Sequence, residues 1–486
     1  MTVFRAIGGA RAAASSSIFK AIGLAALLAL GAAAPAQAAE ALNGAALGVV
    51  WTLPFAGILL SIALMPLFLP KFWHHHYGKV AAFWGLCVVV PFALDLGIGP
   101  TAHVLLEVAL HEYIPFIILL FALFTVAGGV RLTGNLQGSP SLNTAMLFIG
   151  TVLASWMGTT GASMLMIRPL VRANDNRQHN VHVVVFFIFL VSNIGGALTP
   201  LGDPPLFLGF LKGVDFFWTT QALFLPTFFV VVLLLGVFYA IDSYLYRKEG
   251  IVAADPTPDS PIGIEGGVNL ILLGGIILSV LLSGTWKPGI DLSIFGVTVA
   301  LQDLARDILL LVIAYASLRL TTKETRAGNG FSWGPIIEVA KLFGGIFVTI
   351  IPAIAILRAG TGGALGPLVS LASHPDGSPN NAMYFWLAGI LSSFLDNAPT
   401  YLVFFNMASG DAATLMQSLA KTLMAISAGA VFMGANSYIG NAPNFMVKAI
   451  AEEMNVKMPS FFGYMMWSCG ILLPSFALVT LLFFLS

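Results

Sequence analysis

Long apolar stretches recur along almost the whole chain. A transmembrane helix needs about 20 mostly apolar residues. Stretches of this kind cover residues 46–69, 80–98, 114–130, 182–210 (interrupted), 217–241, 268–284, 305–320, 337–357, 420–448 (interrupted) and 461–485. The pattern predicts an all-α polytopic membrane protein with about ten transmembrane helices.

Two further apolar stretches, 141–172 and 383–409, carry a polar break at mid-length and are predicted to be re-entrant hairpins. Composition supports a membrane protein, since 58% of the residues are hydrophobic and 9% are charged. A soluble domain carries roughly 25% charged residues. The formal net charge is zero, which gives no argument for a nucleic-acid partner.

The N-terminus has the features of a secretory signal peptide over residues 1–38. Arg5, Arg11 and Lys20 form a basic region, an apolar run follows, and Ala36-Gln37-Ala38 provides a cleavage site. Cleavage would place the mature N-terminus outside the cytoplasm. The alternative is an uncleaved first transmembrane helix.

The positions of Lys and Arg indicate the orientation. If the mature N-terminus is outside, the loops rich in Lys and Arg fall on the cytoplasmic side, as expected for a bacterial-type inner (cytoplasmic) membrane protein. The longest polar stretch, 247–267, is rich in Pro, Asp and Gly. It is predicted to be a cytoplasmic linker between a first half, 39–246, and a second half, 268–486.

An internal repeat relates the two interrupted helices. Gly196–Pro205 aligns without gaps on Gly434–Pro443 at an offset of 434 − 196 = 238, with the shared pattern G-A-x-[ST]-x-[LI]-G-[DN]-x-P. At the hairpin tips, Thr159 and Thr160 fall opposite Asp396 and Asn397 at an offset of 396 − 159 = 237. The two copies cross the membrane in opposite senses, and such inverted repeats place substrate and ions near the bilayer midplane.

Both interrupted helices contain residues that break a helix. Proline lacks the N–H that continues a helix, and glycine tolerates extended or left-handed backbone. Unwound backbone is tolerated at membrane depth only where it lines protein or a cavity, and its carbonyls are good ligands for hard cations. The helix-breaking residues are Gly195, Gly196, Pro200, Gly202, Pro204, Pro205, Gly434, Gly440 and Pro443.

Hydroxyl and amide side chains in the same segments can complete the ligand shell of a sodium ion. These residues are Ser192, Asn193, Thr199, Asn436, Ser437 and Asn444. No transition-metal site is predicted.

Asp203 and Asp396 are the acidic residues of these motifs. Aspartate near the centre of a membrane helix costs roughly 2.5–3.5 kcal/mol and usually marks an ion path or a proton relay. A carboxylate in this setting can hold either a proton or a sodium ion. The alternative for each residue is a helix cap. Because the repeat partner of Asp203 is Asn441, Asp396 is the first carboxylate to test by mutation.

Motifs for nucleotide-driven or enzymatic chemistry are not found. We find no convincing P-loop, nucleophile elbow or H-E-x-x-H pattern. The sequence therefore predicts a protein that is not an enzyme and needs no cofactor or nucleotide. The predicted coupling ions are Na⁺ (or Li⁺) and H⁺.

The segments "SNIGGALTPLGDPP" and "GANSYIGNAPN", each after a polar hairpin tip, resemble the ion transporter superfamily. This group includes NhaD-type sodium/proton antiporters, ArsB-type arsenite carriers and citrate carriers. The similarity is greatest to NhaD-like antiporters and runs from about residue 46 to the C-terminus.

The resemblance implies a homodimer in which a mobile transport domain moves past a scaffold domain, an elevator-type mechanism. It also implies that the hairpin tips and broken helices surround the ion site. The residues carried over by this resemblance are Thr159, Thr160, Ser192, Asn193, Thr199, Gly202, Asp203, Asp396, Asn397, Thr400, Asn436, Ser437 and Asn441.

The chain departs from the carboxylate carriers of this group. Those carriers have Ser-Asn-Thr at both tips, whereas the tips here read Gly-Thr-Thr and Asp-Asn-Ala. A carboxylate at the second tip would repel an anionic substrate. We therefore expect exchange of sodium or lithium for protons, and the alternative is a sodium-coupled carrier of a dicarboxylate or of an inorganic anion such as arsenite.

Overall fold

The computed structural model describes residues 42–134, 136–250 and 261–485. The predicted signal peptide and its cleavage site lie outside these residues. The described chain is mostly helical, and eight of its helices are long and apolar enough to cross a membrane. They cover Val49–Phe68, Pro70–Asp95, Ile98–Ala127, Val181–Leu198, Phe216–Glu249, Val268–Thr285, Gly334–Arg358 and Phe461–Phe484. The chain is a multi-pass membrane protein.

Two of the ten predicted spans do not qualify as continuous apolar helices. Helix α12 (Leu301–Leu320) is long enough, but it carries Asp303, Arg306, Asp307 and Arg319. The range 420–448 is divided into α19 (Ala420–Met433) and α20 (Ala442–Glu453), each too short to cross a bilayer alone. The predicted span 114–130 begins earlier, because α4 (Ile98–Val108) runs through the π-helical turn η2 (Ala109–Tyr113) into α5 (Ile114–Ala127). Pro115 interrupts the regular hydrogen bonding next to this turn.

Both predicted hairpins are pairs of helices. The first consists of α6 (Pro140–Met157) and α7 (Thr159–Arg172), and the second of α16 (Asn381–Phe394) and α17 (Asn397–Ala408). Both predicted helix breaks are present as well. Helix α8 (Val181–Leu190) passes through η3 (Ile194–Leu198) to α9 (Pro204–Leu211), and α19 passes through η5 (Gly434–Asn436) to α20.

The two repeats pack reciprocally. Helix α9, after the first break, lies against α17 of the second hairpin, and α20, after the second break, lies against α7 of the first hairpin. Helices α10 (Phe216–Glu249) and α21 (Phe461–Val479) also pack on the two repeats. We call the two hairpins, the two broken helices, α10 and α21 together the core unit. Its centre is deeply buried, and every residue of α8 from His182 to Leu190 is buried.

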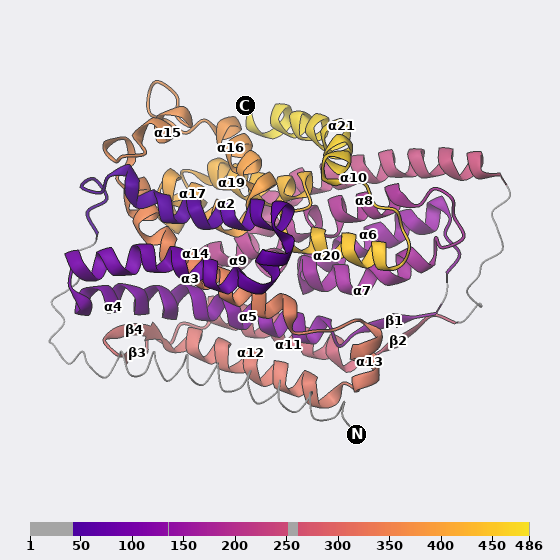
Figure 1. The fold of residues 1–486 in the computed structure, drawn as a ribbon, viewed down its shortest axis with the longest axis horizontal. Helices are drawn as coiled ribbons and strands as arrows, with labels where there is room; N and C mark the ends of the chain where they lie inside the picture. The colour runs from indigo at the N-terminus through magenta and orange to yellow at the C-terminus, as the bar shows by residue number, and fades with distance from the viewer. Residues whose placement is uncertain (1–41, 135, 251–260, 486) are drawn as a thin grey trace.

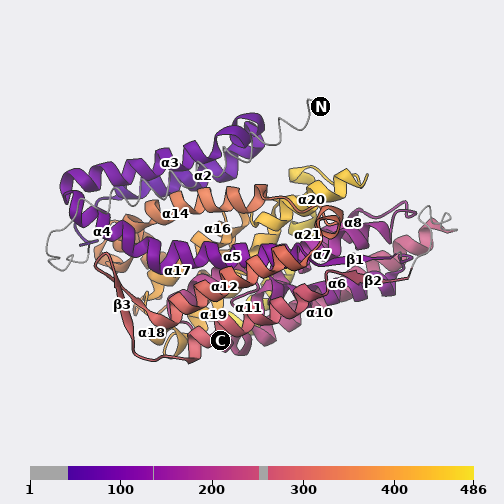
Figure 2. The ribbon, with the colours of Figure 1, turned by 90° about the horizontal axis from the view of Figure 1, so that it is seen from below.

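A second group of helices flanks the core unit. It contains α2 (Leu53–Phe68), α3 (Pro70–Asp95), α4, α5, α11 (Val268–Thr285), α12 and α14 (Gly334–Arg358). Figure 2 shows α14 and α5 between the α2–α3 pair and the α11–α12 pair, in agreement with the contacts between successive members of this layer. We call this group the flanking layer.

Four short strands occur beside the helices, which the all-α prediction did not include. Strand β1 (Arg131–Thr133) pairs with β2 (Gly263–Glu265), inside the range predicted for the linker, and β3 (Asp291–Ile294) pairs with β4 (Val297–Ala300). Phe295 and Gly296, both with positive φ, form the tight turn between β3 and β4. Figure 1 shows the two small sheets at opposite ends of the long axis.

The remaining elements are short. They are η1 (Val49–Thr52), α13 (Lys323–Gly328), η4 (Gly360–Gly362), α15 (Gly366–Leu371), α18 (Ala412–Met416) and the π-helical turn η6 (Thr480–Phe484).

Candidate functional site

The two helix breaks have the same local structure. Ser155 and Ser393, on the first helix of each hairpin, donate a hydroxyl hydrogen bond to the carbonyls of Gly195 (2.5 Å) and Met433 (3.1 Å). Their own carbonyls accept from the hydroxyls of Thr199 and Ser437. Each bond is repeated 238 residues later, so the sequence repeat is also a repeat of hydrogen bonding.

Close backbone packing explains the paired glycines of the motif. A β-carbon at Gly202 would lie 2.2 Å from the carbonyl oxygen of Gly196, and one at Gly440 would lie 2.5 Å from the carbonyl oxygen of Gly434. The carbonyl of Gly202 also accepts the backbone N–H of Thr159, at 2.9 Å. The break and the hairpin tip are therefore fixed to each other.

Gly202→Ala is expected to lower the melting temperature of the purified protein, because the backbone of Gly196 leaves the added methyl no space. Overpacking of this kind costs about 1–3 kcal/mol. Thermal unfolding in detergent measures the effect, with Gly236→Ala as the control, since a β-carbon there meets nothing within 4 Å. Equal melting temperatures for the two variants would contradict the close packing described above.

The structure shifts the alignment of the hairpin tips by one residue. Helix α7 begins at Thr159 after Gly158, and α17 begins at Asn397 after Asp396. The offset is therefore 397 − 159 = 238, as in the breaks. Thr159 corresponds to Asn397, and Asp396 corresponds to Gly158, so the predicted pairing of Thr159 with Asp396 is wrong by one position.

Asp203 lies at the centre of the two repeats. Its carboxylate accepts hydrogen bonds from the Thr159 hydroxyl (3.1 Å), from the Asn441 amide (3.1 Å) and from the Asn397 amide. The residue is 1% exposed. Thr159 and Asn397 are repeat equivalents, and so are Asp203 and Asn441. One carboxylate is thus bound by residues of both halves.

The two aspartates have different local roles. Asp203 occupies the N-cap position of α9, but its side chain makes no capping hydrogen bond. Asp396 does cap its helix, since its carboxylate accepts the backbone N–H of Ala398 at 3.0 Å. The sequence left open that either aspartate is a helix cap, and this role is found for Asp396 and not for Asp203. Asp396 is half-buried and close enough to Asp203 for the two carboxylates to interact electrostatically.

Four helices begin around the Asp203 carboxylate. Thr159 and Asn397 are the first residues of α7 and α17, and Asp203 and Asn441 are the N-caps of α9 and α20. Each helix N-terminus carries roughly half a positive charge. The helix N-termini therefore stabilise the charge of the Asp203 carboxylate, which no ion pair in the described ranges includes.

Ser192 and Asn193 lie next to this centre. The carbonyl of Ser192 accepts from the Asn441 amide at 3.1 Å, and its hydroxyl contacts that of Ser163 at 2.9 Å. The Asn193 amide donates to the Ile188 carbonyl and to the Asn444 side chain.

Three of the residues predicted to bind the ion form hydrogen bonds with backbone carbonyls instead. Thr199 and Ser437 bind hairpin carbonyls, as described above, and Thr400 donates to the Asp396 carbonyl at 3.0 Å within its own helix. Asn436 donates to the Ser393 hydroxyl at 2.9 Å, and Thr160 lines the cavity described below.

Several buried amide oxygens have no hydrogen-bond donor. The side-chain oxygens of Asn193, Asn397 and Asn436 are buried and unpartnered, while the NH₂ group of each residue is fixed by an acceptor. Unpaired buried acceptors are costly. Oxygens of this kind are suitable ligands for a hard cation. Among the described residues, no group of three or more His, Cys, Asp or Glu side chains could hold a metal ion.

A cavity of about 110 Å³ lies beside Asp203. One wall belongs to the core unit and includes Thr159, Thr160, Gly202 and Asp203. The facing wall belongs to α5 and α14 of the flanking layer and is apolar; its residues are Leu119, Leu120, Leu123, Phe124, Pro335, Ile336 and Val339. The polar centre therefore faces an apolar surface.

Sequence reasoning missed several residues that support the site. Ser155 and Ser393 are related by the 238-residue offset, so the repeat itself was a signal for them. Asn444 was predicted only as one of several possible ligands. Its amide donates to the carbonyls of Gly434 and Ser437, and its oxygen accepts from Asn193, which links the two breaks.

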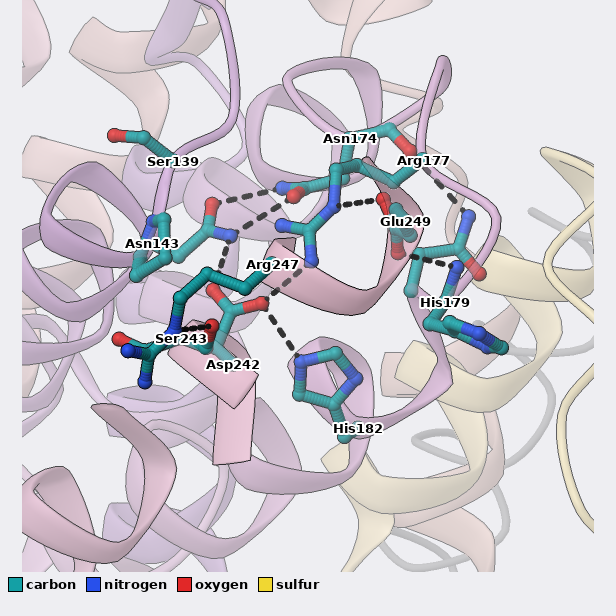
Figure 3. A network of polar contacts seen from close by, with 12 residues as sticks. Ser139, Asn143, Asn174, Arg177, His179, His182, Asp242, Ser243, Arg247 and Glu249 are labelled. Carbon is teal, nitrogen blue, oxygen red and sulfur yellow. Dashed lines mark hydrogen bonds and ion pairs between the residues drawn. The ribbon is translucent and has the colours of Figure 1, made fainter. Parts of the chain in front are cut away.

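A second buried polar cluster lies at the end of the core unit that bears β1 and β2 (Figure 3). Asp242 on α10 accepts from Arg177 (2.8 Å), His182 (2.9 Å) and Asn143 (2.9 Å). Arg177 also pairs with Glu249 at 2.9 Å. The cluster fastens α10 to α6, to α8 and to the loop before α8. Arg177 is one of the loop cations that the sequence analysis used only to assign the orientation, so its ionic partners were not predicted.

Together these features define a multi-pass membrane carrier with a buried polar site between two structural repeats. Comparison with protein families agrees: a profile of the family described as "Putative citrate transport" matches residues 44–484. The chain belongs to this family. The match is consistent with the predicted ion transporter superfamily, and the finer likeness to NhaD-type antiporters stays a prediction. Comparison with curated proteins gives no match.

Proposed function

We propose that this carrier exchanges sodium or lithium for protons, with Asp203 as the group that binds either ion. The observation that supports the proposal best is the Asp203 carboxylate, which is buried, shared by both repeats and bound only by neutral donors. A buried ionised carboxylate without a cationic partner is unfavourable. Uptake of a proton or of a sodium ion neutralises it, and the competition between the two ions is the basis of exchange.

The surroundings of Asp203 favour a cation over an anion. No Lys, Arg or His lines the adjacent cavity within the described ranges, and Asp203 is its charged lining residue. A second carboxylate, Asp396, lies nearby. The unpartnered oxygens of Asn193, Asn397 and Asn436 offer ligands to a dehydrated sodium ion.

The arrangement of the two helix groups supports an elevator-type movement. In this proposal the core unit is the transport domain, and the flanking layer is the scaffold. The apolar wall formed by α5 and α14 would shield the charged site as it passes. We also propose that both hairpins re-enter the membrane without crossing it, that the β1–β2 end faces the cytoplasm, and that the protein is a homodimer of the inner membrane with a cleaved signal peptide.

Inside-out membrane vesicles test the exchange directly. Respiration first acidifies the vesicle interior, and a pH-sensitive dye then reports the gradient. We expect added Na⁺ or Li⁺ to collapse this gradient in vesicles that contain the protein, and K⁺ or choline to have no effect. Vesicles without the protein serve as the control.

The family match favours a second candidate, sodium-coupled uptake of citrate or a related carboxylate. Four helix N-termini at one point would also suit a bound anion. Proteoliposomes with labelled citrate distinguish the two functions. Sodium-driven citrate accumulation, together with no response of the pH gradient to Na⁺ or Li⁺, would show that the protein transports citrate and does not exchange sodium for protons.

A further inference from the structure

A second, larger cavity lies apart from the Asp203 site, at the end of the molecule that bears β3 and β4. Its volume is about 670 Å³, and its walls come from η2, α5, α9, α10, α11, α12 and the β3–β4 hairpin. Helix α9 lies between the two cavities, because Phe207 lines the first and Phe210 lines the second.

Most of the wall of this second cavity is apolar. It includes Ile114, Phe217, Ile308 and Leu311, which are 39–52% exposed. In a membrane protein, exposed apolar side chains on the helices face lipid acyl chains. The cavity is therefore continuous with the lipid-facing surface.

The polar end of the cavity lies at the first turns of α12. Arg306 donates to Asp303 and to Asp307, at 2.9 Å each, and its remaining terminal nitrogen has no partner. The side-chain oxygen of Gln302, one turn before Arg306, is also buried without a donor. Unpaired groups of both kinds, one donor and one acceptor, thus lie next to each other.

Charges of both signs line the cavity. Lys287 and Arg306 are the cations, and Asp215, Asp303 and Asp307 are the carboxylates. A ligand with only negative charge would meet more carboxylates than cations. A ligand with one anionic and one ammonium group matches both signs, and an apolar tail matches the remaining wall.

We infer that this cavity binds a phospholipid with a zwitterionic headgroup that carries a primary ammonium, as in phosphatidylethanolamine. Lys287 and Arg306 bind the phosphate, and the carboxylates with the Gln302 oxygen accept hydrogen bonds from the ammonium. The acyl chains lie along Ile114, Phe217 and Leu311. His111, which contacts the Thr298 carbonyl at 2.9 Å, holds the β3–β4 hairpin beside the headgroup.

Native mass spectrometry of the delipidated full-length protein in a mild detergent tests this inference. The probes are dioleoyl phosphatidylethanolamine, dioleoyl phosphatidylcholine and dioleoyl phosphatidylglycerol. We expect one phosphatidylethanolamine per chain, bound at least tenfold more tightly than the other two lipids. Phosphatidylcholine has the same phosphate, but its quaternary ammonium cannot donate a hydrogen bond.

Two variants remove the site by different means. Arg306→Gln removes the buried cation, with Arg319→Gln on the same helix as its control. Ile118→Trp fills the cavity and leaves every charge in place, with Ile271→Trp on the exposed face of α11 as its control. We expect at least tenfold weaker lipid binding in Arg306→Gln and Ile118→Trp and no change in the controls. If Arg306→Gln does not fold, Ile118→Trp still decides the matter.

Three results would overturn the inference. These are equal binding of the three lipids, undiminished binding in Ile118→Trp, and displacement of the lipid by citrate or inorganic phosphate, which would make the cavity a site for small anions. The readouts do not involve transport, so they are independent of the function proposed for Asp203.

Discussion

Asp203→Asn is expected to abolish sodium-dependent proton exchange while the protein stays folded. The substitution preserves the size of the side chain and removes the group that can ionise. An amide binds neither a proton nor a sodium ion with the required strength. The two ions then no longer compete for the site, and exchange stops. Inside-out vesicles should then respond to Na⁺ no more than vesicles without the protein.

The fold is expected to tolerate this change because the neighbours can adapt. The oxygen of the new amide can still accept from Thr159 and Asn441. Its NH₂ group would face the Asn397 amide, and rotation of that amide would present the unpartnered Asn397 oxygen as an acceptor. We expect an unchanged or higher melting temperature, since an uncompensated buried carboxylate is removed.

Asp396→Asn is the matched comparison for this experiment. Asparagine is as good a helix cap as aspartate, so α17 keeps its N-terminal hydrogen bond. We expect reduced but measurable exchange, because the second carboxylate is lost and Asp203 remains. The opposite ranking, with full activity in Asp203→Asn and none in Asp396→Asn, would transfer the central role to Asp396.

Asp242→Ala is expected to cause the largest loss of stability. It removes the acceptor shared by Arg177, His182 and Asn143, all of them buried. Arg177 keeps its ion pair with Glu249, so the loss comes from the buried donors of Arg177, His182 and Asn143 that no longer have an acceptor. An unsatisfied buried polar group costs about 1–3 kcal/mol. Thermal unfolding in detergent should show a markedly lower melting temperature than for the wild type.

The triple variant Asp242→Leu, Arg177→Met and Glu249→Gln separates lost pairing from lost packing. It removes all three charges of the cluster, including the buried Glu249 carboxylate that pairs with Arg177, and keeps side chains of similar size; such replacements are often neutral. We expect it to recover most of the stability lost in Asp242→Ala. Asp411→Ala, at an exposed cap of α18, is the control for removal of an aspartate elsewhere. A stability for Asp242→Ala equal to that of the control would show that the cluster is not a structural element.

Local patterns in the sequence predict the parts of the site that depend on backbone. Proline and glycine mark both breaks, and the 238-residue repeat shows that they belong together. The direction of a side chain does not follow from such patterns. Asp203 and Asp396 each precede a helix, but the Asp203 carboxylate binds Thr159 and two residues of the other repeat and does not cap its own helix.

Partners far apart in the sequence escaped prediction for the same reason. Arg177 and Asp242 lie 65 residues apart, and no periodic pattern relates them. The ion pairs on α12 were also not predicted. A hydropathy scale gives Arg306 the value of an exposed cation, although it is buried and paired with two carboxylates. The length of a helix is thus easier to predict than the ionic contacts on its faces.

The direct contact between Asp203 and Asn441 has a consequence for how such a chain could evolve. The two residues are repeat equivalents joined by a 3.1 Å hydrogen bond, so the two halves meet directly at this pair. In an ancestor assembled from two identical chains, the same position would hold either two aspartates or two asparagines. Two carboxylates at this distance could not both ionise, and two amides could not ionise at all. Fusion of the halves into one gene is what allows one copy to keep an aspartate while the other supplies an asparagine that donates a hydrogen bond to it.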